Sequence, residues 1–427
     1  MGFQRAFTVV PLLRFMPLSR RNDRRAGAYV QPAAEATAKL GQIFVGGGRG
    51  VTSTATISTA RDLRLDFFRG IALVLIFIDH IPGNGLSHFT VQSIGFSDAA
   101  EIFIFVSGYT ATLVYGRALL KQGEFIAAAK IFHRVWQLYV AHIFVFLIFT
   151  ALVSYNTLTL QNPASGKELH VAKFFAEPYI AVIRALELRF QPTFLDILPL
   201  YIVLLGGFPL VLLLLRWHVL SALIPSFAVY VATQIYGMSL HGYPGNQPWF
   251  FNPLAWQFLF VIGAACGYAR FAQHPILPPP LSRLIGPAAM IVAAAAAIKL
   301  SWTLHGVWNA FPAILFGKLW PIDKSDLAPI RLVHFLALAI VAVRFVPADA
   351  RFLHWRVTQP IIRCGQYSLQ IFCLGILLSV VGHFVLNEWN DSLPAQLAIN
   401  ATGFILMIGT AKLISWYHAI DRATVSA

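Results

Sequence analysis

The chain has 427 residues, of which 57% are hydrophobic and only 12% charged, and its mean hydropathy is +0.67. Soluble domains carry about 25% charged residues, so this composition excludes an ordinary soluble enzyme and indicates a membrane protein. The formal net charge of +14 would suggest nucleic-acid binding in a soluble protein, but membrane topology explains it here, and we expect no nucleic acid as a partner.

The first 60 residues are predicted to form a disordered, basic cytoplasmic tail. Residues 1–64 hold ten Lys and Arg against three Asp and Glu, which is half of the net charge of the whole chain. The segment is rich in Gly, Ala, Ser and Thr and has no sustained apolar period. Such a composition is typical of disordered chain.

Ten apolar segments follow, each long enough to cross about 30 Å of hydrocarbon as a helix. They predict an all-α, polytopic integral membrane protein with about ten transmembrane helices. Their approximate ranges are 66–83, 99–116, 135–154, 195–215, 219–238, 253–270, 284–302, 331–347, 364–386 and 394–416.

Loop charge predicts that both termini face the cytoplasm, because Lys and Arg accumulate on that side of a membrane. With this orientation, the outer loops 83–98, 239–252 and 387–393 carry no Lys or Arg, although the outer loops 155–194 and 303–330 carry some, mixed with Glu and Asp. The longer outer loops are expected to hold short amphipathic helices such as Val171–Leu188. A transmembrane domain would then cover residues 61–420, and residues 421–427 would form a short cytoplasmic tail.

The first apolar segment carries the densest set of ionisable groups, each of which costs on the order of 2.5–3.5 kcal/mol in a membrane on insertion scales. Arg69 and His80 are eleven residues apart, so they project from one helix face with roughly 16 Å between them along the axis. Asp66, three residues before Arg69, is expected to pair with it. Asp79 points about a quarter-turn away from His80 and is not automatically its partner.

A packing histidine and a basic anchor at the cytoplasmic surface would explain His80 and Arg69 separately. However, three ionisable groups lie within fifteen residues of one apolar helix, and two of them share a face. This density favours a functional site.

The second segment begins with Asp98 and Glu101, which suit the positive end of a helix dipole and so also have a structural interpretation. In its middle, Ser107-Gly108-Tyr109 is harder to assign to packing alone, because Gly108 permits close approach of a neighbouring helix or a ligand.

The third segment begins with Lys130 and Arg134, one helical turn apart. The positive-inside rule explains this basic pair. A pocket for the phosphates of a cytoplasmic acyl donor explains it equally well.

These motifs together resemble a known family. Leu65-Asp66-Phe-Phe-Arg69-Gly70 with His80, Phe105-Val-Ser107-Gly108-Tyr109 and the basic third helix resemble the acyltransferase type 3 superfamily of membrane O-acyltransferases. Asp79-His80-Ile81-Pro82-Gly83 and Gly95-Phe-Ser-Asp-Ala-Ala-Glu101 resemble its OpgC branch, which is associated with succinylation of osmoregulated periplasmic glucans. The resemblance covers roughly residues 61–420. The chain departs from the superfamily pattern at Tyr109, where Phe is usual, and at Gln137, where a further basic residue is common.

The resemblance implies an acyl-CoA-dependent O-acyltransferase that spans the bacterial inner membrane several times. It would transfer a succinyl group from cytoplasmic succinyl-CoA to hydroxyls of a periplasmic glucan. Acyl-CoA would be a co-substrate, with no tightly bound cofactor and no metal, and membrane lipid and glucan-synthesis proteins are expected partners.

The resemblance also implies roles for individual residues, although a helix cap and an interfacial aromatic explain Asp196 and Trp256 equally well. The implied catalytic residues are His80, Asp79, Ser107 and Tyr109; the donor-binding residues are Arg69, Asp66, Lys130, Arg134 and Gly108; the acceptor-binding residues are Asp98, Glu101, Asp196, Asn252, Trp256, Gln257 and His334.

Two other functions fit the same residues. The chain could O-acetylate another envelope polysaccharide by the same mechanism, or it could export an acylated molecule with His80 and the intramembrane acids as a proton relay. The absence of an evident internal repeat counts mildly against a transporter.

Overall fold

The computed structural model describes residues 61–159, 163–272, 281–303, 322–388 and 391–426. The predicted tail, residues 1–60, lies outside them. Across these described ranges the protein is helical, and its only β-type pairings are two isolated bridges. The helices are α2 (Leu63–Asp79), α3 (Val91–Ile94), α4 (Ala99–Gln122), α5 (Glu124–Thr159), α6 (Pro163–Glu168), α7 (Ala172–Ala176), α8 (Pro178–Leu186), α9 (Ile197–Gly206), α10 (Phe208–Trp217), α11 (Val219–Tyr236), α12 (Pro253–Ala272), α13 (Leu281–Thr303), α15 (Pro329–Phe345), α16 (Gln359–Gln366), α17 (Ser368–Glu388) and α18 (Leu393–Ser426), with 3-10 turns η1 (Gly85–Phe89) and η2 (Arg351–His354).

A helix occupies each of the ten predicted segments, so the all-helical class is confirmed. Among the described residues, six helices are long and apolar enough to cross a membrane: α4, α5, α11, α13, α17 and α18. The pair α9 and α10 is bent by 47° at Gly207, and it adds a seventh crossing if the two helices form one broken span and none if they form a re-entrant loop. The count of ten crossings stays a prediction.

The ends of the predicted elements differ in two places. The predicted amphipathic helix Val171–Leu188 is split into α7 and α8 by Glu177 and Pro178, because proline cannot continue a helix that it interrupts. At the other end, α18 runs on to Ser426, so the residues predicted to form a short tail continue a helix.

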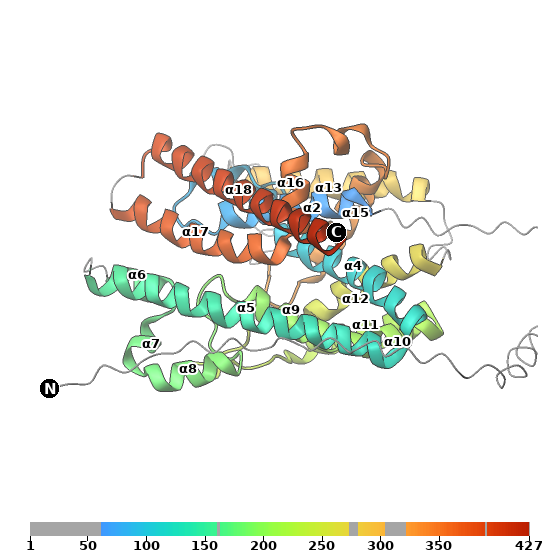
Figure 1. The fold of residues 1–427 in the computed structure, drawn as a ribbon, viewed down its shortest axis with the longest axis horizontal. Coiled ribbons are helices and arrows are strands. Elements are labelled where there is room, and N and C mark those ends of the chain that lie inside the picture. The colour runs from blue at the N-terminus through green and yellow to red at the C-terminus, as the bar shows by residue number, and fades with distance from the viewer. Residues whose placement is uncertain (1–60, 160–162, 273–280, 304–321, 389–390, 427) are drawn as a thin grey trace, which may run out of the picture. The chain divides into compact units, whose positions relative to one another are not determined.

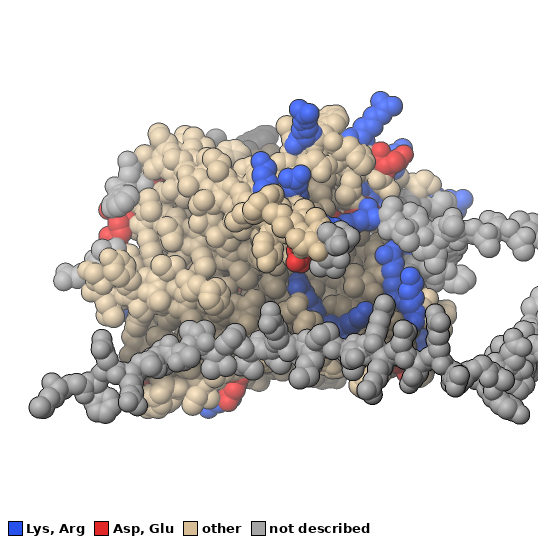
Figure 2. All heavy atoms as spheres, viewed as in Figure 1, with Lys and Arg blue, Asp and Glu red and all other residues tan. Residues whose placement is uncertain are grey.

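The basic side chains lie mostly towards one end of the helices. Most of the Lys and Arg side chains visible in Figure 2 lie towards the end where α18 terminates in Figure 1, and few lie at the end where the chain passes from α17 to α18. This distribution is the one that the positive-inside rule describes for a cytoplasmic end. The orientation itself stays a prediction.

Two helix pairs approach so closely that only glycine fits between them. A Cβ atom on Gly108 of α4 would lie 2.0 Å from the carbonyl oxygen of Phe260 on α12, and one on Gly263 would lie 2.2 Å from the carbonyl oxygen of Phe105. In the same way, Gly70 of α2 abuts the backbone of α16 at Ile361, at 2.0 Å. Small residues give membrane helices their closest packing, and here they fix α2 and α4, which carry the sequence motifs described above.

A buried charge network ties α4 to α15 and to the loop before α15. Arg331 of α15 pairs with Glu101 at 2.6 Å and with Asp98 at 3.1 Å, and Lys324 pairs with Asp98 at 2.8 Å. Asp98 and Glu101 also form a capping box at the start of α4. Burial alone would raise the pKa of Asp98, but the charges of Lys324 and Arg331 hold it well below its ordinary value. Two acids and two bases therefore oppose each other at the start of α4, and their pairing offsets part of the cost of burying them.

We expect Gly70→Ala to destabilise the protein by about 1–3 kcal/mol, because the added methyl group must push α2 away from α16. Thermal unfolding of the purified protein in detergent would measure this loss. Gly409→Ala is the matched control, since nothing lies within 4 Å of a Cβ atom at Gly409. Equal unfolding temperatures for the two variants would contradict the packing.

We expect Arg331→Ala to cost about 3–5 kcal/mol of stability, because it leaves Glu101 buried and without its cation. Glu101 is 0% exposed. Arg344→Ala, on the exposed surface of the same helix, should cost less than about 0.5 kcal/mol. The two variants can be compared in the same denaturation experiment, and a small effect of Arg331→Ala would argue against the network.

Candidate active site

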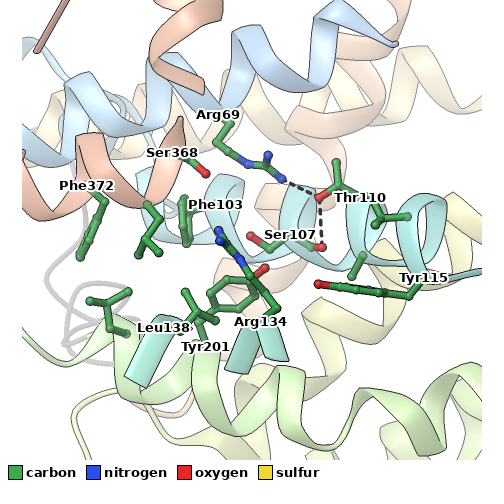
Figure 3. A pocket seen from close by; sticks show the side chains of 14 residues that line it. Arg69, Phe103, Ser107, Thr110, Tyr115, Arg134, Leu138, Tyr201, Ser368 and Phe372 are labelled. Atoms are coloured by element: carbon green, nitrogen blue, oxygen red, sulfur yellow. Dashed lines mark hydrogen bonds between the residues drawn. The ribbon is translucent and has the colours of Figure 1, made fainter. Parts of the chain in front are cut away.

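An inner cavity of about 160 Å³ lies among α2, α4, α5, α9 and α17. Arg69 of α2 and Arg134 of α5 reach into it from opposite sides, with Ser107 of α4 between them (Figure 3). The Arg69 guanidinium donates a hydrogen bond to the Thr110 hydroxyl at 2.5 Å, and Thr110 donates in turn to the carbonyl of Val106.

No carboxylate lines the inner cavity among the described residues. The predicted pairing of Asp66 with Arg69 is wrong: the Asp66 carboxylate accepts two hydrogen bonds from Arg61, at 2.5 and 2.9 Å. Arg61 can do this because it lies in the chain just before α2 and can fold back to the first helical turn. The inner cavity therefore holds two arginines without an acidic partner, an arrangement suited to an anion.

An outer cavity of about 680 Å³ begins further along the same helices. His80, at the C-terminal end of α2, lines it together with Asp79, Asp98, Asp196 and Lys324. The ring of His80 packs against Phe194 with centroids 4.6 Å apart. Its Nδ1 atom is buried and makes no hydrogen bond within the described part of the chain.

The backbone around the histidine contact is unusual. Phe194 adopts a φ of 73°, in the left-handed region that bulky residues rarely enter. Surrounding structure must compensate for this strain. In this strained conformation the ring of Phe194 lies against His80.

Two acids of the outer cavity differ in their partners. Asp79 accepts a hydrogen bond from Gln92 at 3.0 Å, and no hydrogen bond joins it to His80 in the described chain. Asp196 stands at the start of α9 without a capping hydrogen bond from its side chain. Burial raises the pKa of Asp196 to about 6, so this carboxyl can exchange a proton close to neutral pH.

The two cavities follow one another along the bundle. α2 contributes Arg69 to the inner cavity and His80 to the outer, and α4 and α9 likewise line both. Phe372 of α17 lines both cavities.

Several predicted residues lie outside both cavities. Gly108 packs on α12 as described above, Lys130 is exposed, and Tyr109 hydrogen-bonds to Arg270. His334 hydrogen-bonds to Ser97 at 2.8 Å. The structure thus gives Gly108, Tyr109 and His334 packing contacts and leaves Lys130 on the surface.

Three predicted acceptor residues instead hold the loop that carries Lys324 or the helix beside it. The Trp256 indole donates to the carbonyls of Lys324 and Ser325, both at 3.1 Å. The Asn252 side chain donates to Asp326 at 2.7 Å, and Gln257 binds Ser226 of α11. These three side chains therefore do not line the outer cavity themselves but contact the segments behind its lining residues.

Sequence reasoning did not single out Lys324, Thr110 or Tyr201. Lys324 is 226 residues from Asp98 in the chain, and no spacing rule links such positions. Thr110 follows the Ser107-Gly108-Tyr109 motif directly, and its position one turn after Val106 on the face of Ser107 is a signal that could have identified it.

The chain was compared with known proteins. A family model described as OpgC protein matches residues 61–419, a range that contains every residue of both cavities. No curated protein matches the chain. Because the matched range is far more than half of the sequence, the chain belongs to the OpgC protein family.

Proposed function

We propose that this protein is an O-acyltransferase of the bacterial inner membrane that transfers a succinyl group from cytoplasmic succinyl-CoA to a hydroxyl of a periplasmic glucan. Family membership supports an acyltransferase-type enzyme with a role in glucan modification. The observation that carries the proposal is the pair of successive cavities, one holding unpaired arginines and the other His80, with Phe372 common to both.

The donor occupies the inner side. Arg69 and Arg134 bind negatively charged phosphate of the coenzyme through charge-assisted hydrogen bonds. Arg69 lies roughly 16 Å before His80 along α2, so an extended thiol arm can reach from the phosphates towards the histidine. Ser107 and Phe372 line the path that the acyl group takes.

The acceptor occupies the outer side. Asp79, Asp196 and Gln92 offer hydrogen-bond acceptors and donors to sugar hydroxyls, and the rings of Phe250 and Trp249 line the same cavity. Sites of this kind combine apolar surface with a few polar groups that orient the ligand. The larger cavity is therefore assigned to the glucan.

Transfer is a single exchange of bonds. A ring nitrogen of His80 removes the proton from the glucan hydroxyl as its oxygen attacks the thioester carbonyl. The new carbon–oxygen bond forms, the carbon–sulfur bond breaks, and the leaving thiolate takes the proton back from His80. The products are the glucan ester and free coenzyme A.

Replacing the base should stop the reaction. We expect His80→Gln to lower the rate of succinyl transfer by about 10²–10⁴-fold, the range that general-base catalysis contributes. Release of coenzyme A in the presence of glucan, together with the mass of the glucan, measures transfer and separates succinyl from acetyl esters. His88→Gln, at an exposed histidine of η1, is the control. Wild-type activity in a folded His80→Gln protein would refute the mechanism.

Removing an arginine should weaken donor binding more than chemistry. We expect Arg69→Gln to raise the KM for the acyl donor by about 10–100-fold, because one charge-assisted hydrogen-bonding group is lost. Lys121→Gln, at an exposed position of α4, should leave KM unchanged. A fall in kcat with constant KM would instead assign Arg69 to the transition state.

A further inference from the structure

Four basic side chains line the outer cavity away from His80. Lys167, His170 and Lys173 follow one another at intervals of three residues, and Arg189 joins them from the loop after α8. We call these four residues the basic rim. They belong to the segment that holds α6, α7 and α8, which lies beside one end of α5 (Figure 1).

The acidic residues of the same segment do not neutralise the basic rim. Glu168 pairs with His383, Glu177 accepts a hydrogen bond from Tyr243, and Glu187 pairs with Arg184 at 2.7 Å. None of these three glutamates lines the cavity among the described residues.

The lysines of the rim are free. Lys167 and Lys173 are exposed and form no ion pair within the described chain. Arg189 lies 4.0 Å from Glu187, at the limit of an ion pair, and donates to the carbonyl of His241. The rim therefore keeps a positive charge that faces the cavity.

The rim differs from Lys324, a further basic residue that lines the outer cavity. Lys324 is already bound to Asp98, and Asp98 raises the pKa of Lys324 above its ordinary value against the lowering effect of burial. The positive charge of Lys324 is therefore neutralised within the protein. Of the described Lys and Arg residues that line the outer cavity, those of the rim offer their positive charge to a ligand.

Basic residues at this position need a reason. The segment belongs to a loop predicted to lie on the outer side of the membrane, where the positive-inside rule disfavours Lys and Arg. A neutral glucan would also gain little from them. Each succinyl transfer, however, adds a carboxylate to the glucan. The product of the proposed reaction therefore carries negative charge, which the positive rim can bind.

We propose that the basic rim binds anionic groups that the glucan already carries, first of all carboxylates attached in earlier turnovers, while a neighbouring free hydroxyl enters beside His80. This inference rests on the proposed function. A cavity of about 680 Å³ lies in the range of sites that enclose ligands of drug size. The enzyme would then modify one chain repeatedly before releasing it.

Binding without a donor tests the rim directly. The probes are a neutral glucan oligosaccharide, the same oligosaccharide carrying one succinyl ester, and the same oligosaccharide carrying one phosphate ester. Each is titrated into the full chain in detergent. We expect the succinylated probe to bind about tenfold more tightly than the neutral one, and this preference should shrink as salt rises. Tighter binding of the phosphate ester alone would reassign the rim to that group and overturn the carboxylate proposal.

Variants of the rim lysines test whether these residues cause the preference for the succinylated probe. Lys167→Gln with Lys173→Gln should abolish it, and Lys167→Arg with Lys173→Arg should retain it. Arg344→Gln, at an exposed position of α15 that does not line the cavity, should leave it unchanged. Equal affinity of the wild-type protein for neutral and succinylated probes, or no binding of either, would overturn the proposal.

Turnover supplies an independent readout. With limiting enzyme, the wild type should produce a few glucan molecules with many succinyl groups, and the Lys167→Gln, Lys173→Gln variant should distribute single groups over many molecules. Mass spectrometry distinguishes the two patterns. If the charged probe is preferred but no acyl group is ever transferred, the proposed function fails while the rim remains an anionic-glycan site.

Discussion

The cost of burying charge in an apolar bundle governs this protein. Two acids at the start of α4 meet two bases from the far end of the sequence, Lys324 and Arg331. None of these groups would tolerate the interior alone, since breaking a buried pair exposes the survivor to the full desolvation cost. Their mutual pairing joins the start of α4 to the start of α15 and to residues 322–328 before it. Lys324 and Asp98 of this network line the outer cavity together with His80.

The same cost separates structural charges from functional ones. Asp62, Asp66 and Glu101 all have cationic partners in the protein. Arg69 and Arg134 have only neutral ones, Thr110 and Gln137. An arginine cannot lose its proton to escape burial, so such a pair is stabilised most when an anion arrives. Under the proposed function, the positive charge of Arg69 and Arg134 in the inner cavity and that of the basic rim in the outer cavity would each bind an anion.

Periodicity and apolar length were enough to place the helices, because both depend on local backbone geometry. A shared helix face for Arg69 and His80 stays a prediction, since α2 ends at Asp79 and His80 is its C-cap. What failed depended on side-chain choice or on distance along the chain. Asp66 was expected to pair within its helix but found Arg61, which a helix wheel does not include. Asn252, Trp256 and Gln257 were recognised as polar groups near the outer face, yet whether such a group faces a cavity or the loop behind it depends on packing between helices. Lys324 could not be assigned at all, because its partner is on another helix.

Phe372 has a wider consequence. A bilayer presents about 30 Å of hydrocarbon to any polar molecule that crosses it, whereas the inner and outer cavities of this protein share a lining residue, Phe372. Under the proposed function, the acyl group would pass from donor to acceptor beside this residue, so that it would not have to cross lipid and neither substrate would have to leave its own compartment. The ring of Phe372 would then also have to keep the two solutions from mixing.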